Sequence, residues 1–162
     1  MTEQTIGYFH RMYEEASRFH QARRKREKEK RALIAANDWD AVNAWNEREK
    51  QFPNPFAPFT PGQEKAYWAF FQSSEIETGD LEMSDFLWEY EVKDFSDTLR
   101  AAGLTTFVLT NQSTGLMRNI HELETEGWRL VGACKLAVKE NRYGCERIEE
   151  RLGLRFEIEK EG

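Results

Sequence analysis

The chain has few of the residues that build disulfide-rich, metal-binding or membrane-spanning proteins. It has two cysteines and three histidines in 162 residues. Two cysteines do not make the disulfide framework of a small secreted protein, so we expect free thiols in a reducing compartment, the cytoplasm. No apolar run approaches the roughly 20 residues of a membrane-spanning helix. The first residues also lack the basic flank and apolar core of a secretory signal, so we expect no membrane association.

Motifs of known chemistry are also missing. The chain contains neither G-x-x-x-x-G-K-[ST] nor G-x-G-x-x-G, the glycine-rich loops that hold phosphates. His121-Glu122 begins like the zinc motif H-E-x-x-H, but the second histidine is replaced by Thr125. Cys134 falls within an apolar segment, and the sequence places no His or Asp to assist Cys145. We therefore predict a non-enzymatic protein with no catalytic residue, metal site or cofactor.

Proline divides the chain. All four prolines lie between Phe52 and Pro61, a density that excludes a helix or a central strand and predicts an extended connector. We expect a helical hairpin at 1–51, this connector at 52–61, and an α+β domain at 62–162. With 40% hydrophobic residues, the chain can bury a core.

The N-terminal part predicts an αα-hairpin. Helical spacing without proline extends over residues 3–36, and Asn37 or Asp38 can cap a second helix at about residues 39–51. Nine consecutive charges in the first helix must face solvent or an anionic partner. The basic residues of this run form a candidate site for nucleic acid phosphates: Arg23, Arg24, Lys25, Arg26, Lys28, Lys30 and Arg31. Glu27 and Glu29 interrupt the run, and a solvated helix face is the simpler interpretation.

The second part is organised around residues 104–138. Residues 105–110 are β-branched and aromatic and predict a strand. Leu116, Ile120 and Leu123 then recur at helical spacing, and Gly127 can end that helix in the left-handed conformation.

Two further strands follow. Residues 128–138 are apolar on both faces, which predicts a central strand. After the polar stretch 139–151, residues 152–160 alternate and predict a half-exposed strand antiparallel to it. The fold class is therefore α+β: an αα-hairpin, then a small mixed sheet with a β-α-β-β core and helices mainly on one face.

The segment before this core holds two more helices. Thr60, Pro61 and Gln63 match a capping box that opens the first of them. Residues 86–92 favour a strand by alternation, but a helix fits nearly as well, and both interpretations stay open. Asp94 can cap the second helix, which Gly103 ends.

A polar loop precedes the helix at 116–123. Ser113 or Thr114 can serve as its N-cap. A helix N-terminus presents free N–H groups, so these residues could bind an anion with an arginine one turn further on. The candidate anion or partner-binding loop comprises Asn111, Gln112, Ser113, Thr114 and Arg118. Simple capping is the commoner role for such hydroxyls.

Acidic residues gather just before this region. Residues 75–97 hold nine acids and one lysine. This stretch could imitate the phosphates of a nucleic acid and occupy a basic groove on another protein; the plainer alternative is a solvated surface. The candidate acidic surface comprises Glu75, Glu77, Asp80, Glu82, Asp85, Glu89 and Glu91.

The run DFSDTLRAAGLTTFVLTNQSTGLMRNIHELETEGWRLVG resembles an uncharacterised family of small accessory proteins of phages and mobile elements of Gram-positive bacteria. The resemblance covers about residues 82–158, in the order F-x-D-T-L-R-x-A-G, strand, Q-S-T-x-L-M, helix, G-W. The family has no known active site, so no functional residue transfers. It implies an element-borne protein that regulates the element or blunts host defence, for example as an anti-CRISPR.

Three functions follow as expectations. The first is an inhibitor or adaptor that binds a host nucleic-acid-handling protein through acidic and helical surfaces. The second is a nucleic-acid-binding accessory protein that uses residues 23–31. The third is a small-anion or nucleotide binder, or an enzyme, at the loop of residues 111–118.

Overall fold

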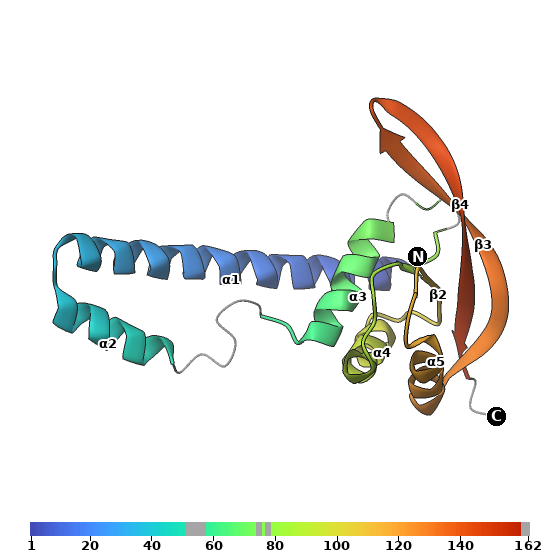
Figure 1. The fold of residues 1–162 in the computed structure, drawn as a ribbon, viewed down its shortest axis with the longest axis horizontal. Coiled ribbons are helices and arrows are strands. Elements are labelled where there is room, and N and C mark those ends of the chain that lie inside the picture. Colours follow the sequence, from blue (N-terminus) through green and yellow to red (C-terminus); the bar gives the residue numbers. More distant parts are fainter. Residues whose placement is uncertain (51–57, 74–75, 77–78, 160–162) are drawn as a thin grey trace. The chain divides into compact units, whose positions relative to one another are not determined.

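The computed structural model describes residues 1–50, 58–73, 76 and 79–159. The chain divides into two compact units, one formed by Met1–Phe9 with Phe59–Gly162 and the other by His10–Pro58. The helices and strands, labelled in Figure 1, are α1 (Glu3–Ala35), α2 (Trp39–Glu49), α3 (Pro61–Gln72), β1 (Glu82–Met83), the 3-10 helix η2 (Glu89–Glu91), α4 (Val92–Ala101), β2 (Thr106–Thr110), α5 (Leu116–Thr125), β3 (Trp128–Arg142) and β4 (Cys145–Ile158).

The unit His10–Pro58 contains most of α1 and all of α2, which form an αα-hairpin. α1 continues without a break through the charged run. Asn37 takes a left-handed φ of 55° in the turn, and Asp38 Oδ1 accepts from Ala41 N at 3.2 Å, which confirms Asp38 as the cap of α2. Val42 is buried on α2. Most of the predicted connector, residues 51–57, lies outside the described residues.

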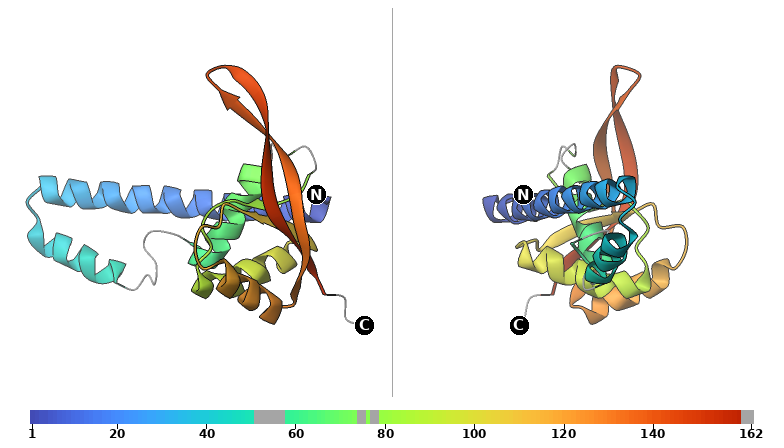
Figure 2. Two further views of the ribbon diagram at one scale, coloured as in Figure 1. Left: turned by 45° about the vertical axis from the view of Figure 1, so that its right-hand side comes forward. Right: turned by 90° about the vertical axis from the view of Figure 1, so that its left-hand side faces the viewer.

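The other unit contains a four-stranded mixed sheet in the order β1-β2-β4-β3. β1 runs parallel to β2, and the other neighbours are antiparallel, so β2, α5, β3 and β4 form the predicted β-α-β-β core. Helices α4 and α5 lie together against one face of the sheet (Figure 2). On that face Phe107 stacks on Phe156, with ring centroids 5.3 Å apart, and meets Phe95 and Trp128 edge to face. These aromatic contacts form the main core.

The opposite face of the sheet has a smaller core. Ile76, Val108, Leu136 and Val138 are buried together there. The same face carries ion pairs, because Arg155 lies opposite Val108 in the register and bonds to Asp80 at 3.0 Å. Helices therefore cover one face of the sheet, and part of the other face is covered by Ile76 and Asp80, which precede β1.

The prediction that β3 is a central strand is wrong. β3 lies at the edge of the sheet, and β4 occupies the position between β2 and β3. A bulge between Leu130 and Gly132 interrupts the register, and Val131 is 48% exposed. The apolar residues on the second face of β3 indicated burial, but no described strand or helix covers most of them.

The polar stretch 139–151 is not a loop. It continues β3 and β4 into a long hairpin, with Lys139 paired to Ile148 and Arg142 paired to Cys145. The turn consists of Tyr143 (φ 54°) and Gly144 (φ 77°), the two left-handed residues of a two-residue hairpin turn. The charged side chains hid the strand pattern, because most described residues of this segment are exposed on both faces.

Residues 86–92 form neither a strand nor one regular helix. An irregular segment leads into η2, and α4 begins at Val92, so Asp94 lies inside the first turn and is not the cap. Glu91 is buried, and its Oε2 accepts from Trp88 N at 3.0 Å. The capping box at Thr60 and the helix ends at Gly103 and Gly127 are confirmed.

Candidate functional site

The seven basic residues of the run 23–31 fall into two sets: those that contact other residues of the helical hairpin, and those that are exposed. Arg23 Nε donates to Glu27 Oε1 at 3.1 Å, and Arg26 Nε lies 3.0 Å from Glu49 Oε1. Lys30 Nζ lies 4.9 Å from the centroid of the Trp45 ring. All three basic residues are half-buried. Arg26 and Lys30 join α1 to α2, Arg23 pairs within α1, and all three are poorly placed to meet a ligand.

The other four basic residues form what we name the outer basic face: Arg24, Lys25, Lys28 and Arg31. All four are exposed, and none forms an ion pair with a residue that the structure describes. Arg24, Lys28 and Arg31 follow the spacing i, i+4, i+7, which places them on one side of a helix with 3.6 residues per turn. Glu27 is engaged by Arg23, which leaves Glu29 as the one exposed acid within the run.

The outer basic face is long enough along α1 to contact several successive phosphates on a nucleic acid strand. From Arg24 to Arg31 the helix rises by about 10 Å, and one strand of B-DNA carries a phosphate about every 3.4 Å along the axis. Lysine and arginine side chains at this spacing can each reach a different phosphate. Sequence reasoning found all seven basic residues but could not separate these four, because the separation depends on where α2 packs.

The predicted caps of α5 are wrong. The N-cap is Gly115, in the left-handed conformation with φ 69°, and no side chain caps the helix. Ser113 and Thr114 are exposed residues that precede it. The chain turns into α5 through a glycine, so the hydroxyls lie too early to bond to the first turn.

Gln112 has a structural role instead of a binding one. Its Oε1 accepts from Leu87 N at 3.3 Å, and its Nε2 donates to the carbonyl oxygens of Asp85 and Thr110 at 2.8 and 2.9 Å. The buried Asn119 donates its side-chain N–H to the carbonyl oxygen of Leu87, so both backbone groups of Leu87 are hydrogen-bonded to side chains. These bonds fasten the segment 85–87 to the start of α5.

The remaining residues of the loop are exposed but meet an acid. Asn111 is exposed with a left-handed φ of 55°. Arg118 Nη1 lies 3.7 Å from Glu89 Oε2. An anion in this loop would compete with that carboxylate, so the geometry favours an anion site less than the sequence did.

The candidate acidic surface is not continuous. Glu82 and Glu91 are only 5% and 4% exposed, so these two carboxylates are not on the surface. Asp80 pairs with Arg155, and Asp85 Oδ2 lies 2.9 Å from Lys65 Nζ. Glu75 and Glu77 lie outside the described residues. The sequence could not show this, because the basic partners are 20 to 75 positions away.

Hydrogen bonds shift the pKa of Asp85 and of Arg155, the partner of Asp80. The hydrogen bond from Lys65 lowers the pKa of Asp85, with a smaller contribution from the Phe86 N–H. The hydrogen bond to Asp80 raises the pKa of Arg155. Both ion pairs act as structural contacts.

A polar pocket of about 470 Å³ lies beside the buried Glu82. Arg151 bridges Glu82 and Glu140 with two bonds of 2.8 Å, and Thr110 Oγ1 donates to Glu82 at 2.8 Å. Burial of Arg151 opposes its charge, but Glu82 and Glu140 outweigh this effect and raise its pKa. The pocket is lined by Gln72, Glu82, Ser84, Val138, Lys139, Glu140, Asn141 and Arg151. Among the described residues that line it there is neither histidine nor cysteine.

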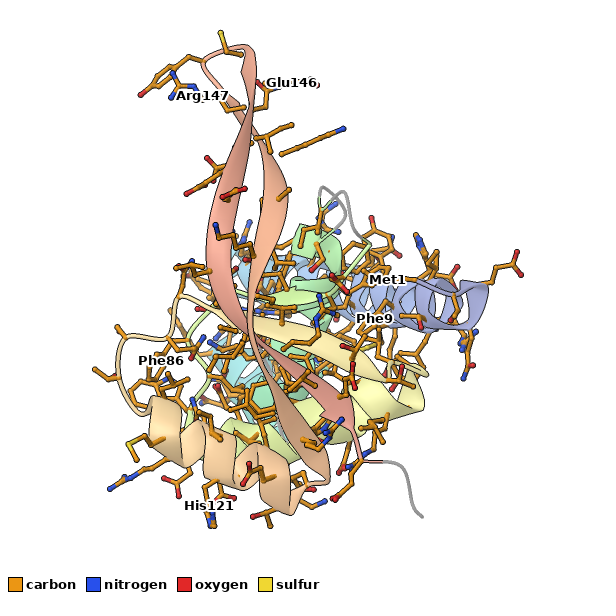
Figure 3. The ribbon with its side chains drawn as sticks, turned by 90° about the vertical axis from the view of Figure 1, so that its right-hand side faces the viewer. Met1, Phe9, Phe86, His121, Glu146 and Arg147 are labelled. Carbon is orange, nitrogen blue, oxygen red and sulfur yellow. The ribbon has the colours of Figure 1, made fainter. Side chains whose placement is uncertain are left out.

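Sequence reasoning missed an exposed aromatic cluster. Phe86 and Trp88 meet edge to face at 4.6 Å, and Trp88 and Tyr90 are 54% and 73% exposed. Met117 on α5 is 85% exposed. Its neighbour in the chain, Arg118, pairs with Glu89 of η2, which lies between Trp88 and Tyr90 in the sequence. Figure 3 shows Phe86 beside the start of α5. We name Phe86, Trp88, Tyr90 and Met117 the aromatic cluster. The alternation of residues 86–92 was the signal, but it suggested a strand.

The described ranges hold neither a metal-ligand cluster nor a membrane-spanning helix. Residues 1–50, 58–73, 76 and 79–159 contain no group of three or more His, Cys, Asp or Glu side chains that could hold a metal ion. In the same ranges, no helix combines the length and the apolar character needed to cross a membrane.

The chain belongs to the family described as a domain of unknown function, DUF7698, which matches residues 65–158. This range includes the region of the resemblance noted above and begins within α3. The outer basic face lies outside it. No curated protein matches the chain, and no solved structure does. The family description states no activity, so the phage or mobile-element origin and the accessory role stay predictions.

Proposed function

We propose that this protein is a non-enzymatic accessory protein that binds nucleic acid through the outer basic face of α1. The observation that carries the proposal is the separation of charge on one helix. Arg23 pairs with Glu27 within α1, and Arg26 and Lys30 contact α2, whereas the four residues of the outer basic face have no acidic partner among the described residues. Such a face binds phosphates without regard to sequence.

This function agrees better with the geometry than docking through the acidic stretch. Glu82 and Glu91 are buried, and Asp80, Asp85 and Glu89 each lie within 4 Å of a basic side chain. An acidic inhibitor surface would need these carboxylates free and side by side. The basic face needs no rearrangement.

The test is a binding titration with a matched control. Labelled duplex and single-stranded oligonucleotides are titrated with the wild type and with R24Q/K25Q/K28Q/R31Q, which keeps good helix formers on α1. The control is R48Q/K93Q/R129Q/R147Q, which removes four exposed basic charges outside α1. Both variants have the same net charge, so a difference between them reports position and not overall charge.

We expect the outer-face variant to lose binding and the control to keep most of it. Each phosphate contact contributes about 0.9 to the slope of log K against log salt on duplex DNA, so the variant loses up to about 3.6 of that slope. Equal losses in the two variants, or wild-type affinity that does not change with salt, would rule out this interface.

We propose the aromatic cluster as a second binding surface, for a protein partner such as a host nucleic-acid-handling protein. Trp, Tyr and Met are enriched where interfaces hold most of their binding energy. Trp88, Tyr90 and Met117 are all at least half exposed and lie on two segments joined by the Arg118–Glu89 pair.

This second surface has its own matched control. In a pull-down from nuclease-treated bacterial lysate, W88A/M117A should lose a protein that the wild type retains. Trp68→Ala, which removes a 50% exposed tryptophan on α3 outside the cluster, should retain it. A protein held equally by both variants would show that the cluster is not its binding site.

A further inference from the structure

The β3–β4 hairpin presents an uncovered face beyond the end of β2. β2 pairs only with residues 153–157 of β4, so residues 145–152 have β3 as their one described strand neighbour. Figure 3 shows Glu146 and Arg147 at the tip, far from α5. Residues paired directly across two strands point to the same face. One face of the hairpin therefore carries the pairs Ala133–Leu154, Lys135–Leu152, Ala137–Glu150, Lys139–Ile148 and Asn141–Glu146. We name it the outer hairpin face.

The two faces differ sharply in burial. On the opposite face Leu136 and Val138 are buried in the smaller core. On the outer hairpin face Ile148 and Leu152 are 63% and 73% exposed, and Ala133 is exposed as well. A two-stranded ribbon is marginally stable in water unless its apolar face is packed against something. A second surface that covered Ile148 and Leu152 would therefore stabilise the hairpin.

Charge is also ordered on the outer hairpin face. Its lysines, Lys135 and Lys139, are both on β3, and its glutamates, Glu146 and Glu150, are both on β4. Lys135 Nζ and Glu150 Oε2 are 3.8 Å apart within the chain, with both side chains about 70% exposed. The face thus has a basic column on β3 and an acidic column on β4, and Ile148 and Leu152 alternate with the glutamates along β4.

This pattern is complementary to itself. If a second ribbon lies face to face on the first, related by a two-fold axis parallel to the strands, its β3 lies over β4 of the first. Each basic column then meets an acidic column, and the lysine stems cover Ile148 and Leu152. Oppositely charged columns favour this arrangement, whereas stacking the two ribbons the other way would bring like charges together.

We propose that two copies of the chain associate through their outer hairpin faces. The dimer is isologous and closed, because each copy uses the same residues. Neither the outer basic face nor the aromatic cluster takes part in it.

The experiment is a charge reversal with exchange, followed by sedimentation velocity. The variants are K135E/K139E, with both columns acidic, and E146K/E150K, with both columns basic. Circular dichroism checks that each variant folds, because Lys135 pairs with Glu150 and Lys139 also takes part in an interaction within the chain. We expect the wild type to dimerise and each variant alone to be monomeric, with a dissociation constant raised by more than about tenfold.

Mixing the two variants gives the decisive result. In the proposed arrangement an equimolar mixture forms a heterodimer, since acidic columns of one copy meet basic columns of the other. Leu152→Thr, which keeps a strand-forming residue, should weaken the wild-type dimer without changing charge. A wild type that is monomeric at every concentration, open-ended oligomers, or no heterodimer on mixing would each overturn the proposal.

Discussion

At the scale of single residues, the carboxylate of Glu82 shows how a buried charge fits this fold. It is 5% exposed and bonds to Thr110 Oγ1 and Arg151. We predict that Glu82→Gln lowers the free energy of unfolding by about 1–3 kcal/mol. This loss is smaller than the loss expected when one partner of a fully buried ion pair is removed, because Arg151 still pairs with Glu140 in the variant. Urea denaturation measures this loss. Glu89→Gln is the control, since Glu89 is half exposed and 3.7 Å from Arg118, and should cost under about 0.5 kcal/mol.

Asp85 provides a test of pH dependence. The pKa of Asp85 is lowered in the folded protein, chiefly by the hydrogen bond from Lys65. The pair therefore stabilises the folded protein fully above the unfolded pKa of about 3.9, and this stabilisation is lost as the pH falls through the lower, folded pKa. The side chain is 61% exposed, so the contribution stays below about 1 kcal/mol. We predict that Asp85→Asn destabilises at pH 7 and that its difference from the wild type shrinks towards pH 3. A difference that is constant with pH would show that the charge of Asp85 is irrelevant.

At the scale of elements, Gly62 permits the close approach of α3 to α4. A Cβ at this position would overlap the Glu91 carbonyl oxygen and lie 2.9 Å from Phe95 N. We predict that Gly62→Ala lowers the free energy of unfolding by about 1–3 kcal/mol, although alanine is the better helix former by about 1 kcal/mol. Thermal denaturation checks it, with Gln72→Ala on the exposed end of the same helix as a neutral control. An unchanged or raised melting temperature for Gly62→Ala would mean that the helices separate without cost.

Elements set by local chemistry could be predicted from the sequence, and elements set by partners could not. Thr60 and Asp38 cap their helices through neighbours three residues away, which a sequence displays directly. The edge position of β3 depends on β4 pairing with β2, and the burial of Glu82 depends on Arg151, 69 positions later. For the same reason the seven basic residues of the candidate site were found as a run, but the division into inner and outer sets required α2.

At the scale of the whole molecule, the α+β unit is assembled from two separate parts of the chain. Residues 1–9 belong to it with residues 59–162, although α1 continues into the other unit. Phe9 is fully buried and stacks on Phe70 with ring centroids 4.5 Å apart. Thr5 Oγ1 donates to Ala102 O at 2.8 Å, which fixes the start of α1 to the end of α4.

We therefore predict that Phe9→Ala destabilises the sheet, far away in sequence, by about 3–5 kcal/mol. Hydrogen exchange followed by mass spectrometry separates the two units, because β2 and β4 report the α+β unit and α2 reports the helical hairpin. Phe19→Ala, the same substitution at a half-buried position in the unit His10–Pro58, is the control and should leave the protection of β2 and β4 unchanged. If Phe9→Ala left the protection of β2 and β4 unchanged, the first nine residues would not be part of the cooperative unit that holds the sheet.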